Sequence, residues 1–64
     1  MKLICTKSIV PWFKVGEVHS MVKTGGIMEV MDNDDDTPQW WYVERTVTGY
    51  AVKLPNGLIL AEFK

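Results

Sequence analysis

The sequence predicts an all-β fold, either a small closed barrel or a strongly bent antiparallel sheet of five to six short strands. Apolar and polar residues alternate with a period of two along much of the chain, and no window has the apolar spacing of a helix of ten or more residues. Two tight-turn signals, Gly25-Gly26 and Asn56-Gly57, each lie between apolar runs. Closure into a barrel is favoured because it removes exposed strand edges.

The first half of the chain is expected to hold one strand and one hairpin. Residues 2–6 are predicted to form the first strand. Residues 17–23 alternate in polarity as a half-buried strand does, and a glycine-rich turn follows them. Residues 27–31 then return, so that residues 15–32 as a whole are predicted to be a hairpin.

The second half begins with a polar loop and continues with three strands. Residues 32–38 are turn-forming and like-charged, which is typical of a solvated loop. Residues 39–46 are rich in Trp, Tyr, Val and Thr, which favour strands, and Gly49 ends this strand or marks a bulge. Residues 50–54 and 58–63 flank the second turn signal and are predicted to pair as a hairpin.

Residues 1–64 are expected to form a single domain of marginal stability. A chain of 7.3 kDa buries about 60% of its unfolded surface, and the apolar part of that area contributes on the order of 95 kcal/mol. Ordering the residues at about 1.5 kcal/mol each costs roughly as much. The single cysteine, Cys5, cannot form an intramolecular disulfide, so no covalent link reinforces this core.

The charge balance and the apolar runs exclude several classes of protein. Seven Lys and Arg residues face eight Asp and Glu residues, a net charge of −1 without the basic excess of a typical nucleic-acid-binding domain. Four of the acids lie within residues 32–36, far fewer than a mimic of DNA would need. The apolar runs are too short for a transmembrane helix, and Lys7 interrupts any signal-peptide core, so we expect a cytoplasmic protein.

The acidic loop is the obvious candidate for a metal site. Asp32, Asp34 and Asp36 match the first three ligand positions of a helix–loop–helix calcium site. Thr37 stands where the glycine of the sharp turn belongs, however, and Val43 stands where the bidentate Glu belongs. We therefore expect a solvated turn without a metal, and weak calcium binding is the alternative.

No residue pattern predicts catalysis or a bound cofactor. His19 is the only histidine, and a lone histidine on an alternating strand is expected at the surface or partly packed. Cys5 is expected to behave as a small apolar residue, although a Cys–His pair is the alternative. A phosphate loop, a nucleophile elbow and zinc-ligand spacing are all lacking, and so small a domain has little room for a ligand-sized pocket.

The adjacent residues Trp40 and Trp41 are the most informative aromatics. Neighbours on a strand point to opposite faces, and a closed barrel has one interior. We expect Trp41 and Val43 to point inward, and Trp40, Tyr42 and Glu44 to point outward. An outward Trp/Tyr pair is typical of binding surfaces; alternatively, the outward ring packs under the loop after the first strand or on a Lys or Arg stem.

A second aromatic pair, Trp12 and Phe13, lies in the loop after the first strand. Pro11 stiffens this segment. One of the two rings is expected to plug the end of the barrel, and the other to remain accessible beside Lys7 and Lys14.

The chain resembles small phage and prophage proteins with an SH3-like barrel. Residues 2–5, followed by Trp-Phe-Lys-Val-Gly-Glu-Val-His at 12–19, resemble the opening of those proteins, and residues 41–43, 49–52 and 62–63 fit the same layout over nearly the whole chain. His19 departs from the pattern, because an aromatic residue is common there, and so does the long acidic loop. The resemblance implies a small cytoplasmic accessory protein that binds and modulates a host protein.

We therefore expect a non-enzymatic protein-binding module, encoded by a phage or prophage, that modulates or inhibits a host protein such as a defence or transcription factor. The expected binding residues are two outward aromatics, one ring of the second aromatic pair and three acids that steer a basic partner: Trp40, Tyr42, Trp12 or Phe13, and Asp34, Asp35 and Asp36.

Two alternatives remain open from the sequence. The first is a small nucleic-acid-binding barrel that stacks bases on Trp12 and contacts phosphates through Lys7, Lys14 and Lys53. The second is a homodimer formed by the outward aromatics, which would supply core that the monomer lacks.

Overall fold

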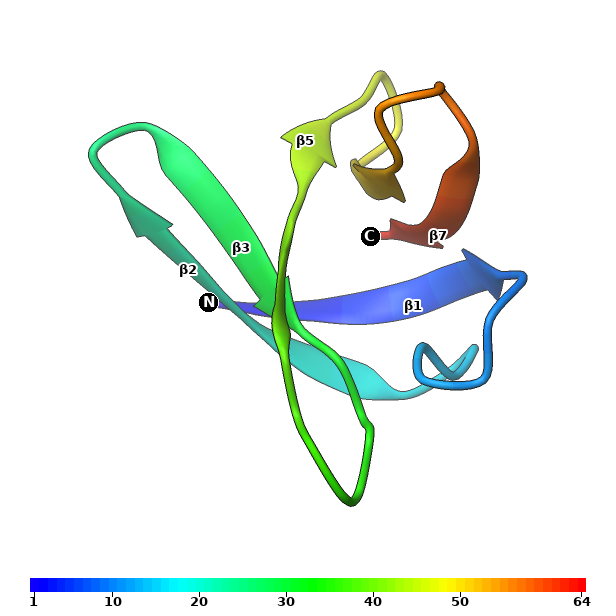
Figure 1. Cartoon of the computed structure of the whole chain (residues 1–64). Coiled ribbons are helices and arrows are strands. Elements are labelled where there is room, and N and C mark those ends of the chain that lie inside the picture. The colour runs from blue at the N-terminus through cyan, green and yellow to red at the C-terminus, as the bar shows by residue number, and fades with distance from the viewer.

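The computed structural model describes all 64 residues and confirms the all-β prediction, with seven strands and no helix (Figure 1). The strands are β1 (Lys2–Ser8), β2 (Val18–Thr24), β3 (Ile27–Met31), β4 (Trp40–Tyr42), β5 (Glu44–Arg45), β6 (Tyr50–Lys53) and β7 (Ile59–Phe63). Every strand pairing is antiparallel. The fold offers no helix long and apolar enough to cross a membrane.

The sheet closes into a barrel-like form because one continuous segment lies at both of its ends. The strand order is β4-β3-β2-β1-β7-β6-β5, and β4 and β5 are parts of the single strand predicted over residues 39–46. Trp40 to Tyr42 pair with β3, whereas Glu44 and Arg45 pair with β6. Val43 lies at the switch, where its N–H donates to the Met28 carbonyl at 3.0 Å and its side chain is buried.

Strand alternation places the core on β1 and, as predicted, on β4. Leu3 and Cys5 are buried, and Trp41 packs against the core. On β2, the buried side chains are Met21 and His19, whereas the valines of that strand are about half exposed. The pairing of β2 with both β1 and β3 fixes this choice of face, because it aligns Met21 with the buried Val30.

The expectation that His19 is at the surface or partly packed is wrong. Its imidazole is 1% exposed and lies 5.5 Å from both the Phe13 and the Phe63 ring centroids. Nδ1 lies 3.0 Å from the Met31 carbonyl oxygen, which can only accept, so Nδ1 carries the proton and donates. Nε2 has no partner. His19 therefore occupies a core position among aromatic rings.

Phe13 is the ring that plugs the barrel. It is 1% exposed and makes edge contacts with Phe63 at 5.4 Å and with Trp41 at 5.9 Å between ring centroids. Such edge-to-face pairs stabilise a core beyond the area that they bury. The prediction that one ring of the Trp12–Phe13 pair plugs the barrel is confirmed. The expectation that Phe13 could be a binding residue is therefore wrong, because a partner cannot reach the buried ring.

Gly49 allows the closest approach between backbone segments. It follows a turn in which the Thr46 N–H donates to the Gly49 carbonyl at 2.8 Å, and the Gly49 N–H donates to the Thr46 hydroxyl at 3.0 Å. A Cβ at this position would lie 2.1 Å from the carbonyl oxygen of Phe63. The glycine is required because β7 passes directly over it.

We expect Gly49→Ala to lower the free energy of unfolding by about 2–3 kcal/mol, because the backbone of Phe63 would have to move to admit the methyl group. Urea denaturation followed by tryptophan fluorescence measures this change. Thr48→Ala, at the exposed neighbouring position, is the matched control and should change stability by less than about 0.5 kcal/mol. Equal stability of the two variants would contradict the packing argument.

Cys5 makes the stability of the fold sensitive to alkali. Burial raises the pKa of its thiol above 9.0, and a backbone hydrogen bond at Lys7 opposes only part of that effect. Because the folded state holds this proton more tightly than the unfolded chain, the contribution is complete below pH 9 and is lost as the pH rises through the raised pKa. Cys5→Ala should therefore show a flatter decline of unfolding free energy above pH 9 than the wild type. Parallel alkaline curves from urea titrations would contradict this assignment.

Candidate functional site

The acidic loop, residues 32–39, is closed at its base by the buried carboxylate of Asp32. This side chain is 5% exposed. Oδ1 accepts from the backbone N–H groups of Asp34 at 3.1 Å and Gln39 at 3.2 Å, and Oδ2 accepts from Nε1 of Trp41 at 2.8 Å. The Asp32 N–H in turn donates to the Gln39 carbonyl at 3.1 Å. Three N–H donors thus replace the water that the buried charge has lost.

Asp34 orders the tip of the same loop. Its Oδ1 accepts from the N–H groups of Asp36 at 3.0 Å and Thr37 at 3.3 Å. The alternation of Asp residues that resembles a calcium loop is therefore a pair of successive side-chain-to-backbone turns. Nowhere do three His, Cys, Asp or Glu side chains converge in an arrangement that could hold a metal ion. Asp35 and Asp36 are exposed and make no side-chain hydrogen bond.

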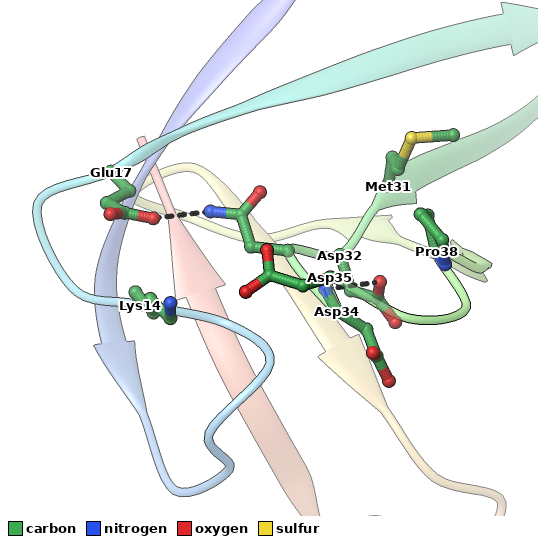
Figure 2. Close-up of a pocket in the computed structure, with 8 residues that line it drawn as sticks. Lys14, Glu17, Met31, Asp32, Asp34, Asp35 and Pro38 are labelled. Carbon is green, nitrogen blue, oxygen red and sulfur yellow. Dashed lines mark hydrogen bonds between the residues drawn. The ribbon is translucent and has the colours of Figure 1, made fainter.

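The loop between β1 and β2 is fastened to the acidic loop and to Trp41. The Asn33 N–H donates to the Trp12 carbonyl at 2.8 Å, and the Asn33 amide donates to the Glu17 carboxylate (Figure 2). The Trp12 ring stacks on Trp41, with centroids 6.0 Å apart and planes 15° apart. Trp12 is therefore only partly accessible. A partner could contact its exposed edge, but the ring cannot insert into a pocket of the partner, because it is packed on Trp41. The sequence carries no signal that pairs these two rings.

A polar hollow of about 390 Å³ lies between the two loops. In Figure 2, Lys14 and Glu17 from the β1–β2 loop lie across it from the acidic residues. Lys14 is the one cation in its lining. An open hollow with a single cation among carboxylates has a negative surface, which favours a basic partner.

Trp40 and Tyr42 point outward from β4, as predicted. Trp40 is 43% exposed and Tyr42 is 73% exposed. In the register of the sheet, Trp40 lies opposite Met31 and Tyr42 lies opposite Glu29. Trp40 follows the acidic loop directly in the chain, so aromatic and acidic groups form one continuous surface.

These aromatics belong to a larger apolar surface that the sequence did not reveal. We call it the outer face: it consists of the outward residues along the stretches where β1 to β4 pair with one another, namely Lys2, Ile4, Val18, Ser20, Val22, Thr24, Ile27, Glu29, Met31, Trp40 and Tyr42. Four aliphatic members are between 44% and 55% exposed. The alternation of residues 17–23 was the available signal, but it does not say which of its two faces is buried.

Each of the cations proposed for nucleic-acid binding has carboxylates beside it. The Lys7 ammonium lies 4.0 Å from the Glu62 carboxylate, and the Lys53 ammonium lies 2.8 Å from that of Glu44. Lys14 lines the acidic hollow. Phosphate groups would therefore meet carboxylates beside each of these three lysines, and no observation favours the nucleic-acid alternative.

No protein-family model, no curated protein and no solved structure matches the chain.

We expect Asp32→Asn to lower the free energy of unfolding by about 2 kcal/mol, because the new amide nitrogen would face the indole N–H of Trp41 without an acceptor. Asp32→Ala removes all three acceptor contacts and should cost more. Urea denaturation followed by fluorescence of the tryptophans measures both. Asp36→Asn is the control, since the Asp36 side chain makes no hydrogen bond. A stability of Asp32→Asn equal to that control would show that the carboxylate does not hold the loop.

Proposed function

We propose that this chain is a non-enzymatic protein-binding module that contacts a basic surface of another protein through Trp40, Tyr42 and the acidic loop. The observation that carries the proposal is the exposure of this aromatic pair on the outer face, directly beside a loop of fixed shape that holds four Asp residues. Trp and Tyr are enriched among residues that dominate binding energy.

The aromatic anchors are held in place before any partner arrives. Trp40 and Tyr42 are on a strand paired with β3, so their backbone does not have to be ordered on binding. The loop that leads into Trp40 is fixed by the Asp32 and Asp34 carboxylates. Preorganisation of this kind lowers the entropic cost of association.

The charges of the loop have two separate tasks. Asp32 and Asp34 accept backbone N–H groups and hold the loop, whereas Asp35 and Asp36 leave their carboxylates free in solvent. Exposed charges at the rim of a binding surface mainly accelerate association and select a partner of opposite charge. We assign partner steering to Asp35 and Asp36, with Asp34 contributing its charge as well.

A non-enzymatic role agrees with the positions of the two nucleophile or base candidates. Cys5 and His19 are each 1% exposed and lie inside the barrel, and neither lines the polar hollow. The resemblance to small phage and prophage proteins supports a host protein as the partner, for example a defence or transcription factor that the chain modulates or inhibits in the host cytoplasm.

Trp40→Ala and Tyr42→Ala should each weaken partner binding by about thirtyfold or more, the loss typical of a binding hot spot. Affinity capture from host lysate with mass spectrometry identifies the partner, and calorimetry on the purified pair measures the loss. Val47→Ala is the control, because Val47 is fully exposed outside the outer face. Melting curves must show that the variants remain folded.

The two substitutions separate a binding role from a packing role. Tyr42 is the more exposed ring, so Tyr42→Ala should bind weakly while it melts like the wild type. If Trp40→Ala unfolds, the ring is part of the core and its assignment as an anchor is wrong. Unchanged affinity of a folded Tyr42→Ala protein would overturn the proposed surface.

A further inference from the structure

We propose that the end of the barrel under the β2–β3 hairpin is a second binding site, which takes an extended acidic segment of another protein. Two independent observations carry the proposal: a hollow whose lining contains cations but no carboxylate, and a strand edge beside it whose backbone groups are unpaired. Neither Trp40, Tyr42 nor the acidic loop lines this hollow, so the new site is separate from the binding surface proposed above.

The hollow at this end of the barrel is the largest on the molecule. Its volume is about 590 Å³, within the range of about 300–1,000 Å³ that binding sites occupy. The hollow is lined by residues of the hairpin, β5 and β6, and the hairpin extends beyond the N-terminus and diverges from β5 (Figure 1). Three methionines and a tyrosine give the hollow an apolar floor, namely Met1, Met21, Met28 and Tyr50.

Strand alternation directs two cations to the side of the sheet that faces the core. Lys23 follows the buried Met21 by two residues along β2. Arg45, in β5, follows the buried Val43 by two residues. Both cations line the hollow, and neither takes part in an ion pair. The Arg45 guanidinium lies over the Tyr50 ring, 6.0 Å from its centroid, which leaves the N–H groups of the guanidinium free for a carboxylate.

No acid of the chain neutralises these cations. The lining of the hollow contains no carboxylate. The two acids of the surrounding strands point to the other side of the sheet: Glu29 belongs to the outer face, and Glu44 forms an ion pair with Lys53. The hollow therefore combines an apolar floor with two free positive charges. Electrostatic complementarity favours an acidic occupant, and the side chain of a glutamate offers both an aliphatic stem and a carboxylate.

A free strand edge lies beside the hollow. The backbone groups of successive residues in a strand point alternately to its two neighbours. The Met21 N–H donates to the Met1 carbonyl at 2.8 Å, and the Met1 amino group donates to the Met21 carbonyl at 3.3 Å. The N–H and C=O groups of Lys23, two residues further along β2, therefore point to the same side, where no residue of the structure pairs with them. An extended peptide in line with β1 would bond both groups.

The strand edge decides which kind of acidic molecule the site takes. A small anion would use the cations alone, whereas an extended segment also pairs with the backbone of Lys23, as in recognition by strand addition. A residue opposite Lys23 directs its side chain into the hollow, because cross-strand partners share a face. Its two neighbours point to the outer face, beside the exposed Val22. We therefore expect acidic and apolar residues to alternate in the bound segment.

Fluorescence anisotropy with the labelled peptide Glu-Val-Glu-Val-Glu tests the site on the full chain. We expect saturable binding that weakens about threefold or more between about 50 and 300 mM salt, because added ions screen the charge contacts. The neutral peptide Gln-Val-Gln-Val-Gln is the matched control and should bind about tenfold more weakly or less. Equal affinity for the two peptides, or no binding of the acidic one, would overturn the site and would leave the surface of Trp40 and Tyr42 untouched.

Charge reversal locates the peptide on the protein. Lys23→Glu and Arg45→Glu should each weaken binding of the acidic peptide about tenfold or more, because each sets a carboxylate in the hollow. Lys64→Glu makes the same change of charge at an exposed lysine outside the hollow and should bind as the wild type does. Melting curves confirm that the variants are folded, and Lys23, on the exposed edge, keeps the test decisive if Arg45→Glu unfolds. An equal loss in Lys64→Glu would show that only net charge matters and would overturn the site.

Methylation of the peptide backbone tests the strand pairing. The acidic peptide with N-methyl groups on its three Glu residues keeps every charge but cannot donate to the Lys23 carbonyl, and it should bind about tenfold more weakly or less. Unchanged affinity would overturn strand addition. Tyr42→Ala should bind the unmethylated acidic peptide as the wild type does, since Tyr42 does not line the hollow. A loss of binding in that variant would place the peptide on the outer face and would contradict a separate site.

Discussion

The fold depends on one geometric constraint, which is that a six-residue segment must hydrogen-bond to two different strands in succession. Residues 40–42 pair with β3 and residues 44–45 pair with β6, so the segment joins the two ends of the sheet. Val43 lies buried where the pairing changes. Gly49 also allows the sheet to close, because only a residue without a side chain leaves room for the backbone of Phe63 in β7. A small chain without a disulfide thus avoids long open strand edges.

The same segment connects the core to the surface. Trp41 points inward and donates its indole N–H to the buried Asp32 carboxylate, which in turn closes the acidic loop. Trp40, one residue earlier, points outward beside that loop. The Asp32 carboxylate therefore stabilises the loop, and the ordered loop holds the exposed Asp35 and Asp36 next to the Trp40 ring. Because Trp40 and Trp41 are adjacent on the strand, each side of the strand carries a large aromatic side chain.

Much of the fold was accessible from the sequence, because local turn chemistry and alternation act over a few residues. Both glycine turns, the acidic loop and the inward direction of Trp41 were predicted correctly. The count of strands differs only because the strand predicted over residues 39–46 is divided by the switch at Val43. The burial of His19 could not be predicted, since it depends on Phe13 and Phe63, which come from distant parts of the chain. For the site, the sequence supplied the outward aromatics and the acids, but not the contacts that fix them.

What the sequence determined by itself is therefore the class of fold, the position of its turns and the opposite directions of two adjacent rings, all of which follow from the two-residue period of a strand. Only the tertiary structure decided which face of β2 is buried, because an alternating segment has two candidate faces and its register with β1 and β3 selects one. That selection placed His19 inside and left the valines outside. It also decided which acids hold the loop and which remain free, since hydrogen-bond partners are set by the closed chain rather than by spacing.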